Sequence, residues 1–206
     1  MHRLLLVVLM SACATLAACS GHDDWSRSRP VPAPAGALGL GFTDPSAPPT
    51  PEAVITPSPG SWSSARPAAG YRVVLLTTGT DTPTQTLTRA VREWAVMEDV
   101  SLKTVTADPA GPVDAVVAAM ELRPDLIVTT GAELTEPLAL VTPSHLDQQF
   151  LVLGTTIPEP TANVTAVAWT ATPDSFTRSR CAAAIRAGTA AVLHDVTGVV
   201  LWLDRY

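Results

Sequence analysis

The chain has 206 residues, of which 47% are hydrophobic, and its formal net charge is −6. That length allows one domain with a substantial core. The negative charge, without any Lys/Arg run, argues against a nucleic-acid-binding protein, whose surface would be basic.

The first 18 residues have the features of a lipoprotein signal peptide. A short basic start is followed by an apolar run, Leu4 to Leu16, which is shorter than the roughly 20 residues that a membrane span needs. The run ends in Leu16-Ala17-Ala18-Cys19, which resembles the lipobox of bacterial lipoproteins. This resemblance implies cleavage before Cys19, lipid on its thiol, and a protein anchored in the bilayer on the extracytoplasmic face of the cell membrane. An ordinary signal peptide with a chance cysteine is the alternative.

Residues 19–70 are predicted to form a disordered tether behind the lipidated cysteine. Residues 20–70 contain ten of the 19 prolines and show no sustained apolar period, so they are not expected to bury enough surface to offset their ordering entropy. Trp25 and Trp62 are isolated apolar residues in this segment. Limited proteolysis is accordingly expected to leave a core that begins near Tyr71.

Residues 71–206 alternate between strand and helix patterns. Apolar runs predict strands at 73–76, 126–128, 150–153, 164–169 and 199–203, and the alternating 101–106 predicts an edge strand. Helical spacing predicts helices around 87–95, 113–120, 134–141 and 173–194. Cys181 lies in the last of these and is expected to be buried. The pattern predicts an α/β fold, an open parallel sheet with helices on both faces, in the order 2-1-3-4-5.

Counted along the chain, the first, third and fourth predicted strands are those at 73–76, 126–128 and 150–153, and each is followed by small polar residues. In the predicted order the first and third strands flank the switch point, where open α/β sheets bind ligands at the carboxyl ends of their strands. We therefore expect a ligand-binding rim there, and expect Gly131→Val to block binding with little effect on stability. The alternative is that turns favour such residues in any case. The predicted rim consists of Thr77, Thr78, Gly79, Thr129, Thr130, Gly131 and Thr155.

The sequence predicts no enzyme. It contains no G-x-S-x-G, H-E-x-x-H, C-x-x-C, P-loop or G-x-G-x-x-G motif in the domain, and its histidines are scattered. Asp81 is the only carboxylate close to the rim on the first strand, and one carboxylate makes no acid/base pair. No cofactor and no metal site is expected.

The order of features from Tyr71 onward resembles the basic membrane protein (BMP) family of substrate-binding lipoproteins, relatives of type I periplasmic binding proteins. The resemblance is clearest in "RPDLIVTTGAELTEPLALVTPSHLDQQFLVLGT" and in "NVTAVAWTATPDSFTRSRCAAAI". It implies a binding lobe, a small polar solute, with a nucleoside-like compound as one candidate, and an ABC permease as partner. It also implies that the chain holds the first lobe plus one helix and one strand of the second, as a one-lobe variant or a truncated product.

Several positions depart from the family pattern. Asp81 stands where the family has an Asp, and Gln85 stands near an expected Asn, so both are candidate ligand-binding residues. Thr84 occupies the place of a stacking Phe, and Thr78 and Gly154 replace carboxylates, which disfavours a purine nucleoside. Two functions follow: a single-lobe solute-binding lipoprotein of an ABC importer, or a surface lipoprotein that has lost ligand binding and serves as an interaction module.

Overall fold

A seven-stranded, fully parallel sheet forms the centre of the molecule. The computed structural model describes residues 24–204. The strands are β1 (Val54–Ile55), β2 (Arg72–Thr77), β3 (Ser101–Thr106), β4 (Leu126–Thr130), β5 (Phe150–Leu153), β6 (Val164–Ala168) and β7 (Val200–Trp202), in the order β1-β7-β6-β5-β4-β2-β3. The predicted α/β fold and strand order are confirmed, because the first predicted strand, β2, lies between the second, β3, and the third, β4.

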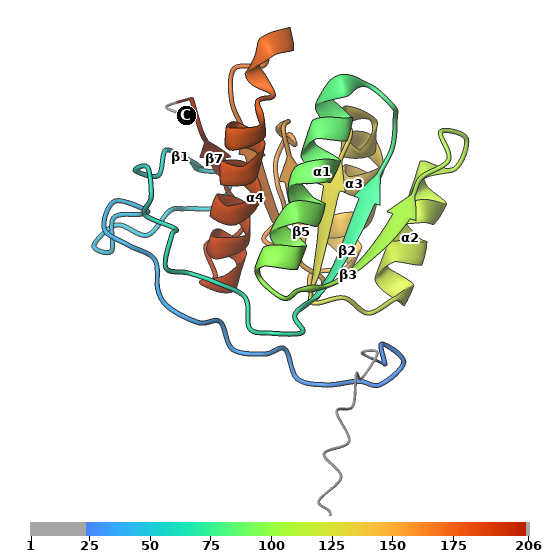
Figure 1. Cartoon of the computed structure of the whole chain (residues 1–206), viewed down its shortest axis with the longest axis horizontal. Helices are drawn as coiled ribbons and strands as arrows, with labels where there is room; N and C mark the ends of the chain where they lie inside the picture. Colours follow the sequence, from blue (N-terminus) through green and yellow to red (C-terminus); the bar gives the residue numbers. More distant parts are fainter. Residues whose placement is uncertain (1–23, 205–206) are drawn as a thin grey trace, which may run out of the picture.

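Helices cover both faces of this sheet (Figure 1). One face carries α1 (Thr82–Met97) and α4 (Arg178–Leu193), which pack against each other, and the other carries α2 (Pro112–Glu121) and α3 (Thr135–Val141). Short 3-10 turns, η1 (Ala132–Leu134), η2 (Thr142–Ser144) and η3 (Pro173–Ser175), precede or follow α3 and α4. Because all strands are parallel and the helices run antiparallel to them, all strands begin at one side of the sheet and end at the opposite side. We name the side where the strands begin the amino edge and the side where they end the carboxyl edge.

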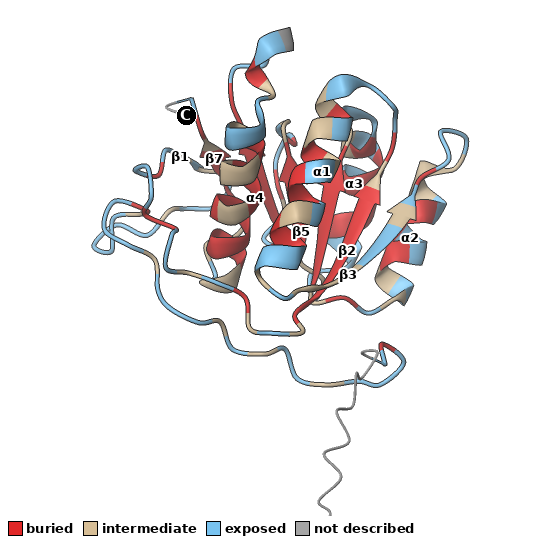
Figure 2. Ribbon diagram, viewed as in Figure 1, coloured by how far each residue is buried: buried red, intermediate tan, exposed pale blue. Residues whose placement is uncertain are grey.

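The central strands are continuous apolar runs because both of their faces are covered. All residues of β4, β5 and β6 are buried, whereas β3, at the end of the sheet, leaves several side chains in solvent (Figure 2). On the α1/α4 face, Leu75, Trp94 and Ile185 contribute to one apolar cluster, and on the α2/α3 face Leu76, Ile127 and Leu138 contribute to a second. A sheet with two covered faces thus explains the strands' lack of alternation.

Residues 24–70 are not a disordered tether, so the prediction for this segment is wrong. They form a strap that runs along the amino edge and then contributes β1 to the sheet beside β7 (Figure 1). Trp25, Phe42 and Trp62 are buried, with Phe42 and Trp62 in the apolar cluster of the α1/α4 face. A few large aromatic side chains supply the buried area that the segment's periodicity does not reveal.

The strap also satisfies its own backbone. Ala35 and Arg66 exchange two backbone hydrogen bonds of 2.9 Å, and the amide of Gly39 donates to the carbonyl of Ser61. These backbone groups of the strap are therefore paired within the strap itself.

Three further expectations concern individual segments. Cys181 is buried as predicted, and burial raises the pKa of its thiol to about 11, as for an inert core residue. No helix among residues 24–204 is long and apolar enough to span a bilayer. The signal peptide, residues 1–18, and Cys19 lie outside the described residues.

Candidate ligand-binding site

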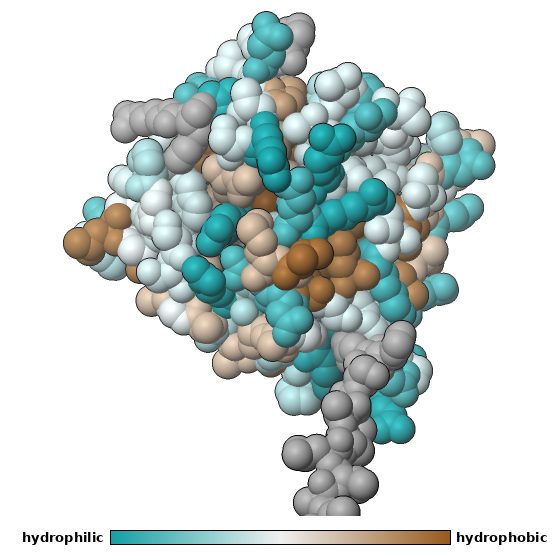
Figure 3. Space-filling model, in the orientation of Figure 1, coloured by the Kyte–Doolittle hydropathy of each residue, from teal (hydrophilic) through white to brown (hydrophobic). Residues whose placement is uncertain are grey.

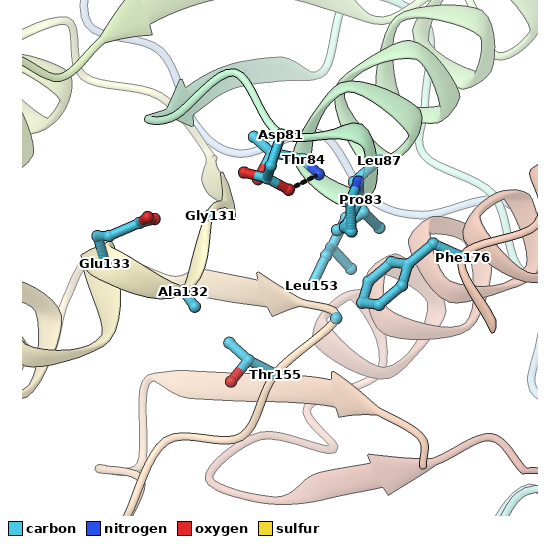
Figure 4. Close-up of a pocket in the computed structure, with 11 residues that line it drawn as sticks. Asp81, Pro83, Thr84, Leu87, Gly131, Ala132, Glu133, Leu153, Thr155 and Phe176 are labelled. Carbon is cyan, nitrogen blue, oxygen red and sulfur yellow. Dashed lines mark hydrogen bonds between the residues drawn. The ribbon is translucent and has the colours of Figure 1, made fainter. Parts of the chain in front are cut away.

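A pocket of about 260 Å³ opens at the carboxyl edge, over the ends of β2, β4 and β5. Its wall is made by the residues that follow these strands and by the turn before α4 (Figure 4). The pocket therefore lies at the switch point, where β2 is the neighbour of both β3 and β4. The residues that line it are Asp81, Pro83, Thr84, Leu87, Gly131, Ala132, Glu133, Leu153, Gly154, Thr155 and Phe176.

Asp81 has a structural role at this edge, because it caps the amino end of α1. One carboxylate oxygen accepts a hydrogen bond of 2.9 Å from the amide of Thr84, and the other accepts one of 2.8 Å from the Thr84 hydroxyl. These bonds lower the pKa of the carboxyl, with the backbone amide as the largest cause. Asp81 is therefore held as an anion at the rim, where it lines the pocket.

Glu133 brings a second carboxylate to the same place. It lies in η1, directly after the end of β4, and is exposed. A methyl group on Gly79 would lie 3.1 Å from Asp81 Oδ2 and 3.9 Å from both Glu133 oxygens. The nearest oxygen atoms of the two carboxylates are therefore at most 7.0 Å apart, the sum of 3.1 Å and 3.9 Å. Neither Lys nor Arg is among the residues that line the pocket.

Phe176 forms the opposite wall, and its ring faces the space across from the two carboxylates (Figure 4). The predicted helix over 173–194 is divided here: η3 ends at Ser175, and α4 begins at Arg178 with Thr177 as its N-cap. The Ser175 hydroxyl accepts from the indole N–H of Trp169, whose ring packs against Phe176 with centroids 5.1 Å apart. This break in the helix places an aromatic ring in the pocket.

The threonine hydroxyls at the ends of β2 and β4 are engaged with one another. Thr130 Oγ1 donates to Thr77 Oγ1 at 2.8 Å, and both lie within 3.2 Å of the Thr88 hydroxyl on α1. Thr78 and Thr129 are buried. None of these five threonines lines the pocket.

The remaining predicted residues divide into two groups. Asp81, Gly131 and Thr155 line the pocket. Gly79 lies beside the two carboxylates, and Gln85 is exposed on α1, where its amide donates to the carbonyl of Thr80. The two Thr-Thr-Gly segments do stand side by side as predicted, since Thr77 pairs with Thr130 in the β2–β4 register.

The expectation that Gly131→Val would spare stability is not consistent with the geometry. Gly131 has a φ of +112°, and a Cβ atom there would lie 2.7 Å from the carbonyl oxygen of Thr78. Residues other than glycine rarely adopt this backbone conformation. The atom that the new Cβ would meet belongs to the backbone of Thr78, so it cannot move aside as the end of a side chain could. Gly131 is thus needed where β4 passes close to the end of β2.

Sequence reasoning missed Glu133 and Phe176. Glu133 lies two residues beyond Gly131, the last predicted rim residue after β4. It could have been found by looking for carboxylates after this strand as well as after the first predicted strand. No local signal marks Phe176, because it reaches the pocket from the segment between β6 and α4. Among residues 24–204, no cluster of His, Cys, Asp and Glu has the composition of a metal site.

Comparison with known proteins finds similarity in structure only. No family model matches the chain, and no curated protein matches it. A solute-binding protein of an ABC transporter system from Aeropyrum pernix K1 superposes with a TM-score of 0.43 and 22% identity over 48% of this chain and 28% of that one. A fragment provisionally named a lipoprotein, from Peptoclostridium difficile 630, gives 0.48 and 17% over 60% of this chain and 98% of its own.

A periplasmic ribose ABC transporter protein from Conexibacter woesei DSM 14684 gives a TM-score of 0.37 and 15% identity over 66% of this chain and 55% of that one. The chain therefore spans less than two thirds of the first and third of these proteins. The strand order, rather than these distant similarities, establishes the fold as an open parallel α/β sheet.

Proposed function

We propose that the protein is a lipid-anchored, extracytoplasmic solute-binding protein, similar to the BMP-type receptors of ABC importers, and that it is not an enzyme. The observation that carries the proposal is the pocket at the switch point, with two carboxylates on one side and the ring of Phe176 on the other. An ABC permease is the proposed membrane partner, and Cys19 is the proposed lipid attachment site.

The lining of the pocket indicates the kind of solute. Its volume lies just below the roughly 300 Å³ at which pockets for drug-sized ligands begin, so the ligand is small. Asp81 and Glu133 accept hydrogen bonds and carry negative charge, while Leu87, Leu153 and Phe176 offer apolar contact. A small amine, or a solute rich in hydroxyl donors, with one apolar face satisfies both sides.

Titration calorimetry against amines, polyols and nucleosides tests this function. Glu133→Gln removes the charge of a carboxylate for which the described residues offer no ion-pair partner. It is expected to weaken binding about tenfold or more, as the loss of a charged hydrogen bond does. Asp81→Asn keeps an N-cap acceptor, so it tests the second carboxylate without removing the cap.

The matched control is Glu136→Gln, a change of the same type one turn further on, in α3 and outside the pocket. It is expected to leave binding unchanged. A wild-type protein that binds no member of the panel, or a Glu133→Gln variant that binds as tightly as the wild type, contradicts the proposal.

One observation favours the second candidate, an interaction module without a ligand. The hydroxyls of Thr77, Thr88 and Thr130 satisfy one another, so part of the polar rim is unavailable to a solute. If the panel yields no ligand, this function is preferred, and capture of a protein partner through the lipid-anchored chain is the measurement that supports it.

A further inference from the structure

A second pocket, of about 230 Å³, lies at the amino edge of the sheet, opposite the candidate site. It is formed by residues that precede β2, β4 and β5, by the end of α4, and by the strap. None of the residues that line it belongs to the pocket at the carboxyl edge. We name it the strap pocket, and it is a separate cavity of the same domain.

Two polar side chains that line the strap pocket lack hydrogen-bond partners. Tyr71 is 2% exposed, and its hydroxyl makes no hydrogen bond to another described residue. The side-chain oxygen of Gln149 is buried and also has no partner. Burial, and after it the charge of Asp125, raises the pKa of the Tyr71 hydroxyl, which therefore stays protonated. Because buried polar groups are as a rule hydrogen-bonded, these two atoms point to a molecule that bonds to them in the pocket.

The charge of the lining favours a cation. Three carboxylates line the strap pocket, those of Asp125, Asp147 and Asp195. Asp125 pairs with Arg29 at 2.9 Å, whereas Asp147 and Asp195 are exposed and have no ion-pair partner among the described residues. The 16-residue helix α4 also ends here, and the carboxyl end of a helix carries partial negative charge. The pocket therefore has an excess of negative charge.

The apolar part of the lining favours an organic cation over a metal ion. No group of His, Cys, Asp and Glu side chains among residues 24–204 has the composition of a metal site. Val31, Pro32 and Pro34 line the pocket from the strap, and Val192 and Leu193 line it from α4. These residues offer contact to an aliphatic chain, and the volume limits that chain to a few carbon atoms.

We propose that the strap pocket binds a small organic cation, an ammonium or guanidinium group on a short aliphatic chain. The cationic group donates hydrogen bonds to the Gln149 oxygen and the Tyr71 hydroxyl, and Asp147 and Asp195 balance its charge. The aliphatic chain lies against the apolar residues of the strap and α4. This site is independent of the pocket at the carboxyl edge and of the function proposed for it.

Titration calorimetry of the full chain in an amine-free buffer tests the proposal. The probes are n-butylamine and n-butylguanidine, with n-butanol as their neutral analogue. Each is titrated into the wild type and into Glu133→Gln, in which the pocket at the carboxyl edge is impaired. We expect both cations to bind about tenfold or more tightly than n-butanol in both proteins, as charged hydrogen bonds do.

Two results of these titrations overturn the proposal. If n-butanol binds as tightly as the cations, or if no probe binds, the pocket holds water or apolar groups only. If Glu133→Gln abolishes binding of the cations, they occupy the pocket at the carboxyl edge instead.

Asp195 and Asp99 give a matched test of the charge. Each directly follows the C-cap of a helix, α4 or α1, and their φ angles are +58° and +53°. Only Asp195 lines the strap pocket, whereas Asp99 lies at the end of α1, where Val96 and Met97 are exposed and Figure 3 shows a brown area. Asparagine tolerates this backbone conformation, so both Asp→Asn variants are expected to fold.

Asp195→Asn is expected to weaken binding of both cations several-fold and to leave n-butanol unaffected. Asp99→Asn is expected to change neither. Equal effects of the two substitutions, or no effect of Asp195→Asn, overturn the proposal.

Tyr71→Phe and Gln149→Leu test the two unpaired atoms. Each removes a polar atom that has no partner in the fold, so the urea midpoint of unfolding is expected to stay the same or rise, while cation affinity falls several-fold. Gln148→Leu, next to Gln149 but outside the pocket, is the control for binding. Wild-type affinity in both test variants overturns the proposal, and so does a lowered urea midpoint in both, because the two atoms are then satisfied within the protein.

Discussion

Gly131 shows at the scale of a single residue how tightly the rim is built. We predict that Gly131→Ala destabilises the fold by about 1–3 kcal/mol, because the new Cβ meets the Thr78 carbonyl oxygen at 2.7 Å and φ is +112°. Urea unfolding followed by circular dichroism measures this loss.

Gly70→Ala is the matched comparison for that prediction. Gly70 also has a positive φ, +73°, but a Cβ atom there would meet nothing within 4 Å. This variant carries the conformational strain without the collision, so its loss of stability is expected to be clearly smaller. If Gly131→Ala proves no more destabilising than Gly70→Ala, the close approach of β4 to the end of β2 is incorrect.

Individual site residues were predictable only in part. Asp81 and Gly131 follow strands whose apolar runs are evident, so their place at the rim could be read from the chain. The hydrogen-bond partner of each hydroxyl could not be read from the chain, because Thr77, Thr88 and Thr130 belong to three different elements and bond to one another. Phe176 was equally hidden, since only the fold brings the turn before α4 over the end of β5.

The strap yields a prediction at the scale of an element. Trp62 is 5% exposed within the cluster of the α1/α4 face, whereas Leu40, in the same strap, is 98% exposed. Trp62→Ala is expected to cost about 3–5 kcal/mol, as for a large aromatic residue removed from a core. Leu40→Ala is expected to change stability by less than about 0.5 kcal/mol.

Chemical denaturation of the two variants, followed by circular dichroism, checks this difference. Limited proteolysis gives an independent measurement, and the expected resistant fragment now retains Trp25 and Trp62 instead of beginning near Tyr71. A Trp62→Ala protein as stable as the wild type means that the strap does not belong to the core.

The elements from Tyr71 onward could be predicted well because each carries its own period. β3 and β5 have the predicted bounds, and α1 and α2 include the predicted apolar positions. β1 could not be found in this way, because a strand of two residues, Val54–Ile55, is too short to show a period. The strap's burial rests on isolated aromatic residues, which proline-rich composition conceals.

The whole molecule is expected to unfold as one unit. The strap contacts the amino ends of β2, β3 and β4 and pairs with β7 at the other end of the sheet, so it cannot detach without opening both. Tryptophan fluorescence, to which Trp25 and Trp62 contribute two of the five tryptophans, and far-ultraviolet circular dichroism should therefore give the same midpoint in urea. An earlier fluorescence transition would show that the strap melts separately.

The pairing of β1 with β7 also affects the order in which the chain reaches its native state. Val54 leaves the ribosome long before its partner, Val200. During folding the strap must therefore wait while the strands between them assemble, and long-range pairing of this kind is slow. Its many prolines and its scarcity of apolar runs keep the waiting segment from pairing with other chains. The composition that resembles a spacer is thus suited to a segment that is made well before the strand on which it docks.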